Sequence, residues 1–169
     1  MRPQETDYPA FFQKYVALAN GEDIKEILSR SQNDLEDFLN NIPQSKADYA
    51  YGNGKWTVKE VLQHCIDSER IFAYRALCHA RGEQQPLPGF DQEEYATYID
   101  VQNRSLNDLK TELLLIRQTT TLLFNSFSAA DMERTGFIGE NPIKAFCWGF
   151  IITGHFIHHQ NILQSKYFV

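Results

Sequence analysis

The sequence has no run of 18 apolar residues, so we expect no helix that crosses a membrane. Its N-terminal segment contains Arg2, Glu5 and Asp7 and lacks the apolar core of a signal peptide. An excess of basic residues is also absent, because 16 lysines and arginines stand against 22 aspartates and glutamates, a formal net charge of -6. This charge disfavours binding to a phosphate backbone, so we expect no nucleic-acid partner.

Cysteine is scarce in the chain. Cys65, Cys78 and Cys147 are odd in number, form no CxxC pair and lie in apolar stretches. Such residues are typical of small buried side chains in a reducing compartment, and we therefore expect a cytoplasmic protein. Cys65 follows His64 directly, and neighbours in a helix point about 100° apart, so we expect Cys65 in the core and outside any site.

Hydrophobic residues, by contrast, are abundant at 43%, and 13% of the residues are aromatic. This composition excludes a disordered chain, and 169 residues lie within the usual size of one domain. We see no internal repeat and no composition shift. The sequence therefore predicts a single helical-bundle domain over residues 1–169.

Hydrophobic spacing and helix-capping residues predict an all-α fold. Thr57 with Glu60 predicts a capping box, and Asn141 followed by Pro142 predicts the start of the last helix. The expected helices are a short leading one over 8–20 and four long ones over 23–41, 58–81, 105–127 and 142–166. Four long helices with long connections predict a four-helix bundle. We expect the loop over 82–103 to be partly helical and to lie over one end of the bundle.

The histidines form the most informative pattern in the sequence. His155 and His159 lie about 40° apart on the last predicted helix, whereas His158 points about 100° away from His159. This spacing favours His155 with His159 as a metal-binding pair, and His158 is then a neighbour of the ligands or an interface residue. Because three histidines would be costly in an apolar helix, a metal ion is the leading interpretation. A third histidine, such as His64, completes a site with an open position.

The other polar candidates have alternative interpretations. His79 is expected in the core, where it interacts favourably with the C-terminal end of its helix. Asp67, Glu69 and Asp91 can serve as metal ligands or orient the imidazoles, but solvent-exposed positions suit them equally well. Asp91 and Glu94 are the candidate general bases in the long loop.

Four segments of the chain resemble the DinB-like superfamily. They are Lys55–Arg70 (KWTVKEVLQHCIDSER), residues 72–77 (FAYRAL), residues 86–92 (PLPGFDQ) and the HxxHH motif from His155 to His159. This resemblance implies a four-helix bundle with a divalent metal ion bound by one histidine of the second helix and two of the fourth. The matching residues are His64, His155 and His159.

The resemblance also implies a chemistry. The superfamily includes transferases and isomerases that use low-molecular-weight thiols. We therefore expect Zn²⁺ or Ni²⁺ to bind a small-molecule thiol as its thiolate. The expected activity is that of a thiol S-transferase, in which the thiolate attacks an electrophile. The alternatives are a hydrolase that activates water at the same centre, a non-catalytic metal-binding bundle, and a bundle without metal. The family resemblance and the apolar last helix indicate a homodimer.

Overall fold

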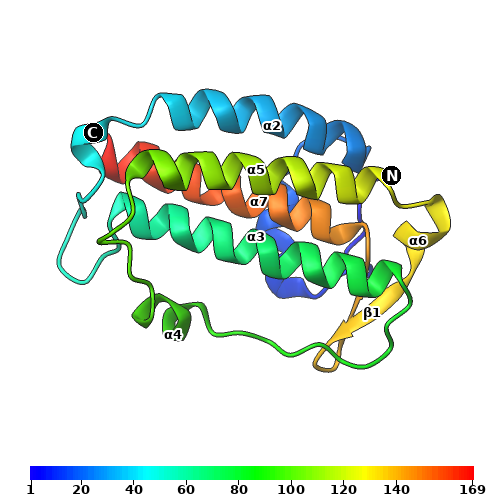
Figure 1. The fold of residues 1–169 in the computed structure, drawn as a ribbon. Coiled ribbons are helices and arrows are strands. Elements are labelled where there is room, and N and C mark those ends of the chain that lie inside the picture. Colours follow the sequence, from blue (N-terminus) through cyan, green and yellow to red (C-terminus); the bar gives the residue numbers. More distant parts are fainter.

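Four long helices form a bundle in the computed structural model, which describes all 169 residues (Figure 1). They are α2 (Ile24–Asn40), α3 (Val58–Ala80), α5 (Leu106–Asn125) and α7 (Cys147–Ile162). Both α5 and α7 pack against α2 and α3, so α5 and α7 occupy opposite corners of the bundle. In Figure 1, α3 and α5 run in one direction and α2 and α7 in the other. The predicted all-α, four-helix architecture is confirmed.

The starts of the long helices follow local capping chemistry. The Thr57 hydroxyl accepts a hydrogen bond from the Glu60 amide (3.2 Å), and the Glu60 carboxylate accepts one from the Thr57 amide (2.6 Å). Ser105 and Asp108 form a second capping box at α5, and Asp23 caps α2. Each cap satisfies amide donors that the helix itself leaves unpaired. The capping box predicted at Thr57 is therefore confirmed.

The leading helix is short, as the sequence predicts. A 3₁₀ turn, η1 (Ala10–Phe12), leads into α1 (Gln13–Leu18), which packs along α7. At Gly154 a Cβ atom would lie 1.8 Å from the carbonyl oxygen of Tyr15. Only glycine therefore lets the backbone of α1 approach α7 this closely.

The start of the last helix differs from the prediction. A hairpin of β1 (Thr135–Ile138) and β2 (Asn141–Lys144) precedes it, and α7 begins only at Cys147. Gly139 takes the positive φ of 55° that the turn requires, and the Lys144 amide donates to the Asp7 carbonyl (3.0 Å). The helix start predicted at Asn141 is therefore wrong, because residues 141–144 pair with β1 as a strand. Beyond α7 a π-helical segment, η3 (Leu163–Tyr167), extends the helix as far as expected.

The connection from α3 to α5 returns along the length of the bundle (Figure 1). It contains α4 (Gln92–Thr97), capped by Asp91, which accepts from the Glu93 (2.8 Å) and Glu94 (3.2 Å) amides. Leu87 lies at the edge of β1: its amide donates to the Phe137 carbonyl (2.9 Å), and its carbonyl accepts from the amide of Gly139, just beyond β1 (3.1 Å). The expected helical portion is confirmed, but the segment lies beside α3 and not over the end of the bundle.

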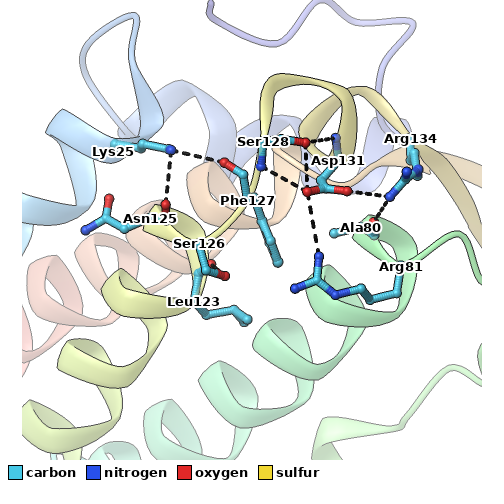
Figure 2. Close-up of polar contacts among 10 residues, drawn as sticks. All are labelled: Lys25, Ala80, Arg81, Leu123, Asn125, Ser126, Phe127, Ser128, Asp131 and Arg134. Atoms are coloured by element: carbon cyan, nitrogen blue, oxygen red, sulfur yellow. Dashed lines mark hydrogen bonds and ion pairs between the residues drawn. The ribbon is translucent and has the colours of Figure 1, made fainter.

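A polar network closes the corner after α5, where α6 (Ala129–Glu133) lies (Figure 2). Lys25 of α2 donates to two backbone carbonyls at the end of α5, at 3.3 and 3.1 Å. Ser128 and Asp131 cap α6, and the Asp131 carboxylate pairs with Arg81 (3.6 Å) and Arg134 (2.5 Å). The corner is thereby joined to the ends of α2 and α3.

The bundle interior contains one buried ion pair. Arg117 of α5 donates two hydrogen bonds of 2.8 Å to the Glu69 carboxylate of α3 and a third, of 3.0 Å, to the Ser31 hydroxyl of α2. Glu69 is therefore fully engaged, and its interpretation as a metal ligand is wrong.

Another 3₁₀ turn, η2 (Gln44–Lys46), lies in the α2–α3 connection. None of the helices has the length and apolar composition that crossing a membrane requires.

Candidate metal centre

His64, His155 and His159 each bring a ring nitrogen to one region between α3 and α7. These nitrogens lie within 4.8 Å of one another, and Nε2 of His64 lies 3.1 Å from Nε2 of His155. His64 and His155 are buried, and His159 is half-buried. The structure thus brings together the three residues predicted from spacing and family resemblance.

Two regular helices position these rings. The cap at Thr57 fixes the start of α3 and places His64 in its second turn, while His155 and His159 project from successive turns of α7. Aromatic rings surround the group: the Trp56 ring lies 4.9 Å from His64, and Phe72 lies 5.7 Å from His155, edge to face. The apolar surroundings reduce the access of water to the rings.

Burial controls the charge of the three histidines. Burial first, and then repulsion by neighbouring histidines, lowers the pKa of His64 to about 4 and that of His159 to about 3. The pKa of His155 also lies well below its ordinary value, first through burial and then through repulsion by His159 and His64. All three rings are therefore neutral at pH 7 and keep the lone pairs that bind metal ions.

The donor set fits a transition-metal ion. The His64–His155 contact is the only side-chain hydrogen bond of the three rings, so no carboxylate or carbonyl competes for their nitrogens. Imidazole nitrogen suits zinc and nickel, and no fourth protein ligand belongs to the group. Three protein ligands leave a position for water or substrate, as in catalytic zinc sites.

The remaining candidates lie outside this group. His158 contacts Tyr15 and His159, with ring centroids 5.6 and 5.1 Å away, and its nitrogens do not join the three. Asp67 accepts a hydrogen bond from Gln63 (2.9 Å), and Asp91 caps α4. As the helical spacing indicates, His158 is a neighbour of the predicted ligands.

His79 has a different role from the one expected. It is fully buried, as predicted, and its Nδ1 accepts a hydrogen bond from the Trp148 indole (3.1 Å). Burial lowers the pKa of His79 to about 4, so the ring is neutral. The prediction that a charged His79 interacts with the C-terminal end of α3 is therefore wrong. A Cβ at Gly136 would lie 2.2 Å from the ring, so this glycine leaves the space that His79 occupies.

Two cavities border the histidines, and several residues that line them had no signal in the sequence. One, of about 240 Å³, reaches His159 and includes Glu93, and the other, of about 380 Å³, reaches His155. Both also include Lys14, Tyr15 and Gln92. These residues come from α1 and the long connection, and no spacing rule links either segment to the histidines. A larger cavity of about 590 Å³ between α3 and α4 contains none of the three.

Comparison with known proteins places these features in a family. The chain matches the DinB superfamily over residues 27–163, which include the three histidines. It belongs to the DinB superfamily. The resemblance found in the sequence is thereby confirmed.

Relatives of this DinB-superfamily chain carry names that refer to metals. Two proteins of Oceanobacillus iheyensis bear the name "putative metal-dependent hydrolase". The first, OB0782, is 29% identical over 127 residues, or 69% of this chain and 71% of that protein. The second, OB0413, is 28% identical over 82 residues, 47% of each chain. The names describe those proteins and agree with a metal-dependent enzyme.

A solved structure shares the fold. YfiT from Bacillus subtilis, described as a probable metal-dependent hydrolase with an unusual four-helix bundle topology, superposes with a TM-score of 0.73. The match covers 98% of this chain and 91% of YfiT at 17% sequence identity. At this identity the match establishes the fold alone.

Proposed function

We propose that this protein is a metal-dependent hydrolase whose divalent ion is held by His64, His155 and His159. The convergence of three neutral ring nitrogens within 4.8 Å carries the proposal. The names of the relatives support it, since both Oceanobacillus iheyensis proteins are named for metal-dependent hydrolysis. The same arrangement argues against a purely structural ion, which normally has four protein ligands.

A zinc or nickel ion bound by three imidazoles supplies a Lewis acid and activates water at neutral pH. A residue of the chain itself must accept the proton that the attacking water loses. Glu93 is the only carboxylate that lines the cavity at His159, and it is therefore our candidate for accepting the proton of the attacking water. The bases expected from the sequence suit this role less well, because Asp91 is engaged as a helix cap and Glu94 lines neither cavity.

Thiol transfer remains a prediction from the family resemblance. A three-nitrogen site with an open position accepts a thiolate as well as water, and no lining residue of either cavity distinguishes the two. The thiol and electrophile partners, the homodimer and the cytoplasmic location also stay predictions. The experiments below therefore include a thiol.

Metal content is the first test. Mass spectrometry of tag-free protein is expected to find close to one zinc or nickel ion per chain in the wild type. His64→Ala, His155→Ala and His159→Ala should lose the ion, while the matched control His158→Ala should keep it. Folded wild-type protein that takes up no metal from added Zn²⁺ or Ni²⁺ would contradict the proposal.

Turnover is the second test. Metal-loaded protein is assayed on p-nitrophenyl esters and anilides and, in parallel, with a low-molecular-weight thiol and 1-chloro-2,4-dinitrobenzene. Hydrolysis without thiol that His159→Ala abolishes supports the proposal, and turnover that requires the thiol assigns a transferase instead. Glu93→Gln should lower kcat by roughly 100-fold with the metal retained. Absence of all turnover in metal-loaded protein indicates a non-catalytic bundle.

A further inference from the structure

Arg75 is a buried cation without a carboxylate partner. It lies on α3 and is 5% exposed, and it lines the cavity that reaches His155. Its one side-chain hydrogen bond runs from Nη2 to the Pro88 carbonyl (2.7 Å), and none of the ion pairs of the chain includes it. A guanidinium has five N–H donors, and a buried arginine is normally paired with an anion. Most donors of Arg75 therefore make no hydrogen bond within the protein.

The cavity around Arg75 is positive in an otherwise acidic protein. Its lining includes Arg75 and Lys14 and contains no aspartate or glutamate, although the chain has a net charge of -6. The buried hydroxyl of Ser68, which also lines it, has no hydrogen-bond partner. Two cations and a free hydroxyl in a partly enclosed space attract an anionic oxygen group.

Between Arg75 and the histidines the cavity wall is aromatic. The Phe72 ring lies 5.7 Å from the His155 ring and 6.0 Å from Cζ of Arg75, so both groups border the same ring. Phe90, whose ring lies 5.4 Å from Cζ of Arg75, adds to this wall. A ligand with an apolar body about the size of one aromatic ring therefore reaches from the guanidinium to the histidines.

We propose that Arg75 binds the anionic end of the substrate, a carboxylate or a phosphate, while the apolar body of the substrate lies against Phe72. The substrate class is thus a small apolar or aromatic molecule with one anionic oxygen group. The identification of this ligand as a substrate rests on the proposed function, whereas its binding at Arg75 does not. The competing role for Arg75 is purely structural, in which it joins the long connection to α3 through Pro88 and the surrounding rings.

Binding to the metal-free protein tests the proposal, because a metal ion would itself attract an anion. The full-length chain, treated with EDTA, is titrated calorimetrically with 3-phenylpropionate, phenyl phosphate and the neutral 3-phenylpropionamide. We expect at least one of the two anions to bind about tenfold or more tightly than the amide, and the better one identifies the anionic group. Equal affinities for the anions and the amide overturn the proposal.

Variants locate the binding. Arg75→Gln is expected to remove the preference for the anion, whereas Arg81→Gln, a control arginine near the end of the same helix, should retain it. An unchanged preference in folded Arg75→Gln assigns Arg75 the structural role. If circular dichroism shows that Arg75→Gln does not fold, Arg75→Lys replaces it. The lysine variant keeps the charge but loses the planar fork, so we expect several-fold weaker anion binding and unchanged amide binding, and unchanged anion binding overturns the proposal.

The two proposals fail separately. His159→Ala should lose the metal and keep the anion preference, and Arg75→Gln should do the reverse. Anion preference in a wild-type protein that takes up no metal would remove the proposed hydrolase and leave the anion site. Metal uptake with turnover but without anion preference would remove the anion site alone.

Discussion

Nε2 of His64 and Nε2 of His155 face each other at 3.1 Å across the contact between α3 and α7. Burial lowers the pKa of both rings, so neither carries a charge at pH 7. Two neutral rings can share this contact only if one of them carries its hydrogen on Nε2. A metal ion removes this restriction, because every ring can then direct a lone pair at the same cation.

Metal saturation should therefore stabilise the fold. At a free Zn²⁺ concentration 100 times the dissociation constant, the free energy of unfolding should rise by about 2.7 kcal/mol. Urea unfolding with EDTA and with Zn²⁺ measures the difference. His159→Ala is expected to show no such rise, and an equal rise in that variant would place the ion elsewhere.

Stability of the metal-free protein should depend on pH. The folded-state pKa values of His64, His79 and His159 are about 4, 4 and 3, below the ordinary value of 6.5. Between these limits the unfolded chain binds more protons, so stability is complete above pH 6.5 and falls as the pH drops toward 4. Each buried histidine contributes on the order of 1 kcal/mol per pH unit. Urea midpoints at pH 7, 6 and 5 measure the slope, which His64→Gln should reduce; equal midpoints would contradict the expectation.

The close approach of α1 and α7 depends on Gly154. In Gly154→Ala the new methyl group meets the Tyr15 carbonyl, so α1 must move away, at a cost of roughly 1–3 kcal/mol. Because α1 borders both cavities through Lys14 and Tyr15, anion binding and turnover should weaken as well. Gly52→Ala is the control, since a Cβ there makes only an ordinary contact of 3.7 Å with the Lys55 side chain and Gly52 lines neither cavity. Equal unfolding free energies for the two variants would contradict the steric argument.

The Glu69–Arg117 ion pair should be strongly coupled. Arg117→Leu leaves a buried carboxylate without its cation and is expected to lower the free energy of unfolding by about 3–5 kcal/mol. The double variant Glu69→Leu/Arg117→Leu should lower it by less than the sum of the two single changes. The more exposed pair of Arg70 and Glu112 serves as the control, and its removal should cost no more than about 1 kcal/mol. Additive effects in a double-mutant cycle at Glu69 and Arg117 would contradict the coupling.

Thiol reactivity should distinguish the cysteines. Cys65 and Cys147 are buried, and burial raises the pKa of both thiols, whereas Cys78 is half-buried. Only Cys78 should react quickly with Ellman's reagent in the native protein, and all three cysteines should react in urea. Cys78→Ser should remove the fast phase, and a fast phase that persists in this variant would show that another cysteine is accessible.

The sequence predicts the long helices and the histidine centre because both depend on local rules. Caps such as Thr57 with Glu60 act within one turn, and the 3.6-residue period places His155 and His159 on one side. The third residue of the group, His64, required the family resemblance, since no periodicity shows which helices meet. The structure brings all three together.

The remaining features depend on contacts between distant segments. Asn141 and Pro142 carry the local pattern of a helix start, but pairing with residues 135–138 and the bond from Lys144 to Asp7 select a strand. His79 lies near a helix end, where a charge is favourable, yet the Trp148 indole donates to its neutral ring. The cavity at Arg75 is lined by residues of five separate segments that no spacing rule connects.

The long connection between α3 and α5 contributes to the walls of both cavities but not to the metal-binding group. The metal-binding histidines all belong to α3 and α7, whereas Phe90, Gln92 and Glu93 reach the cavities from the connection. Replacement of residues 89–93 therefore changes the ligand-facing wall and leaves both metal-binding helices intact. Substitutions in this segment can therefore alter which ligands bind, while the three metal-binding histidines stay unchanged.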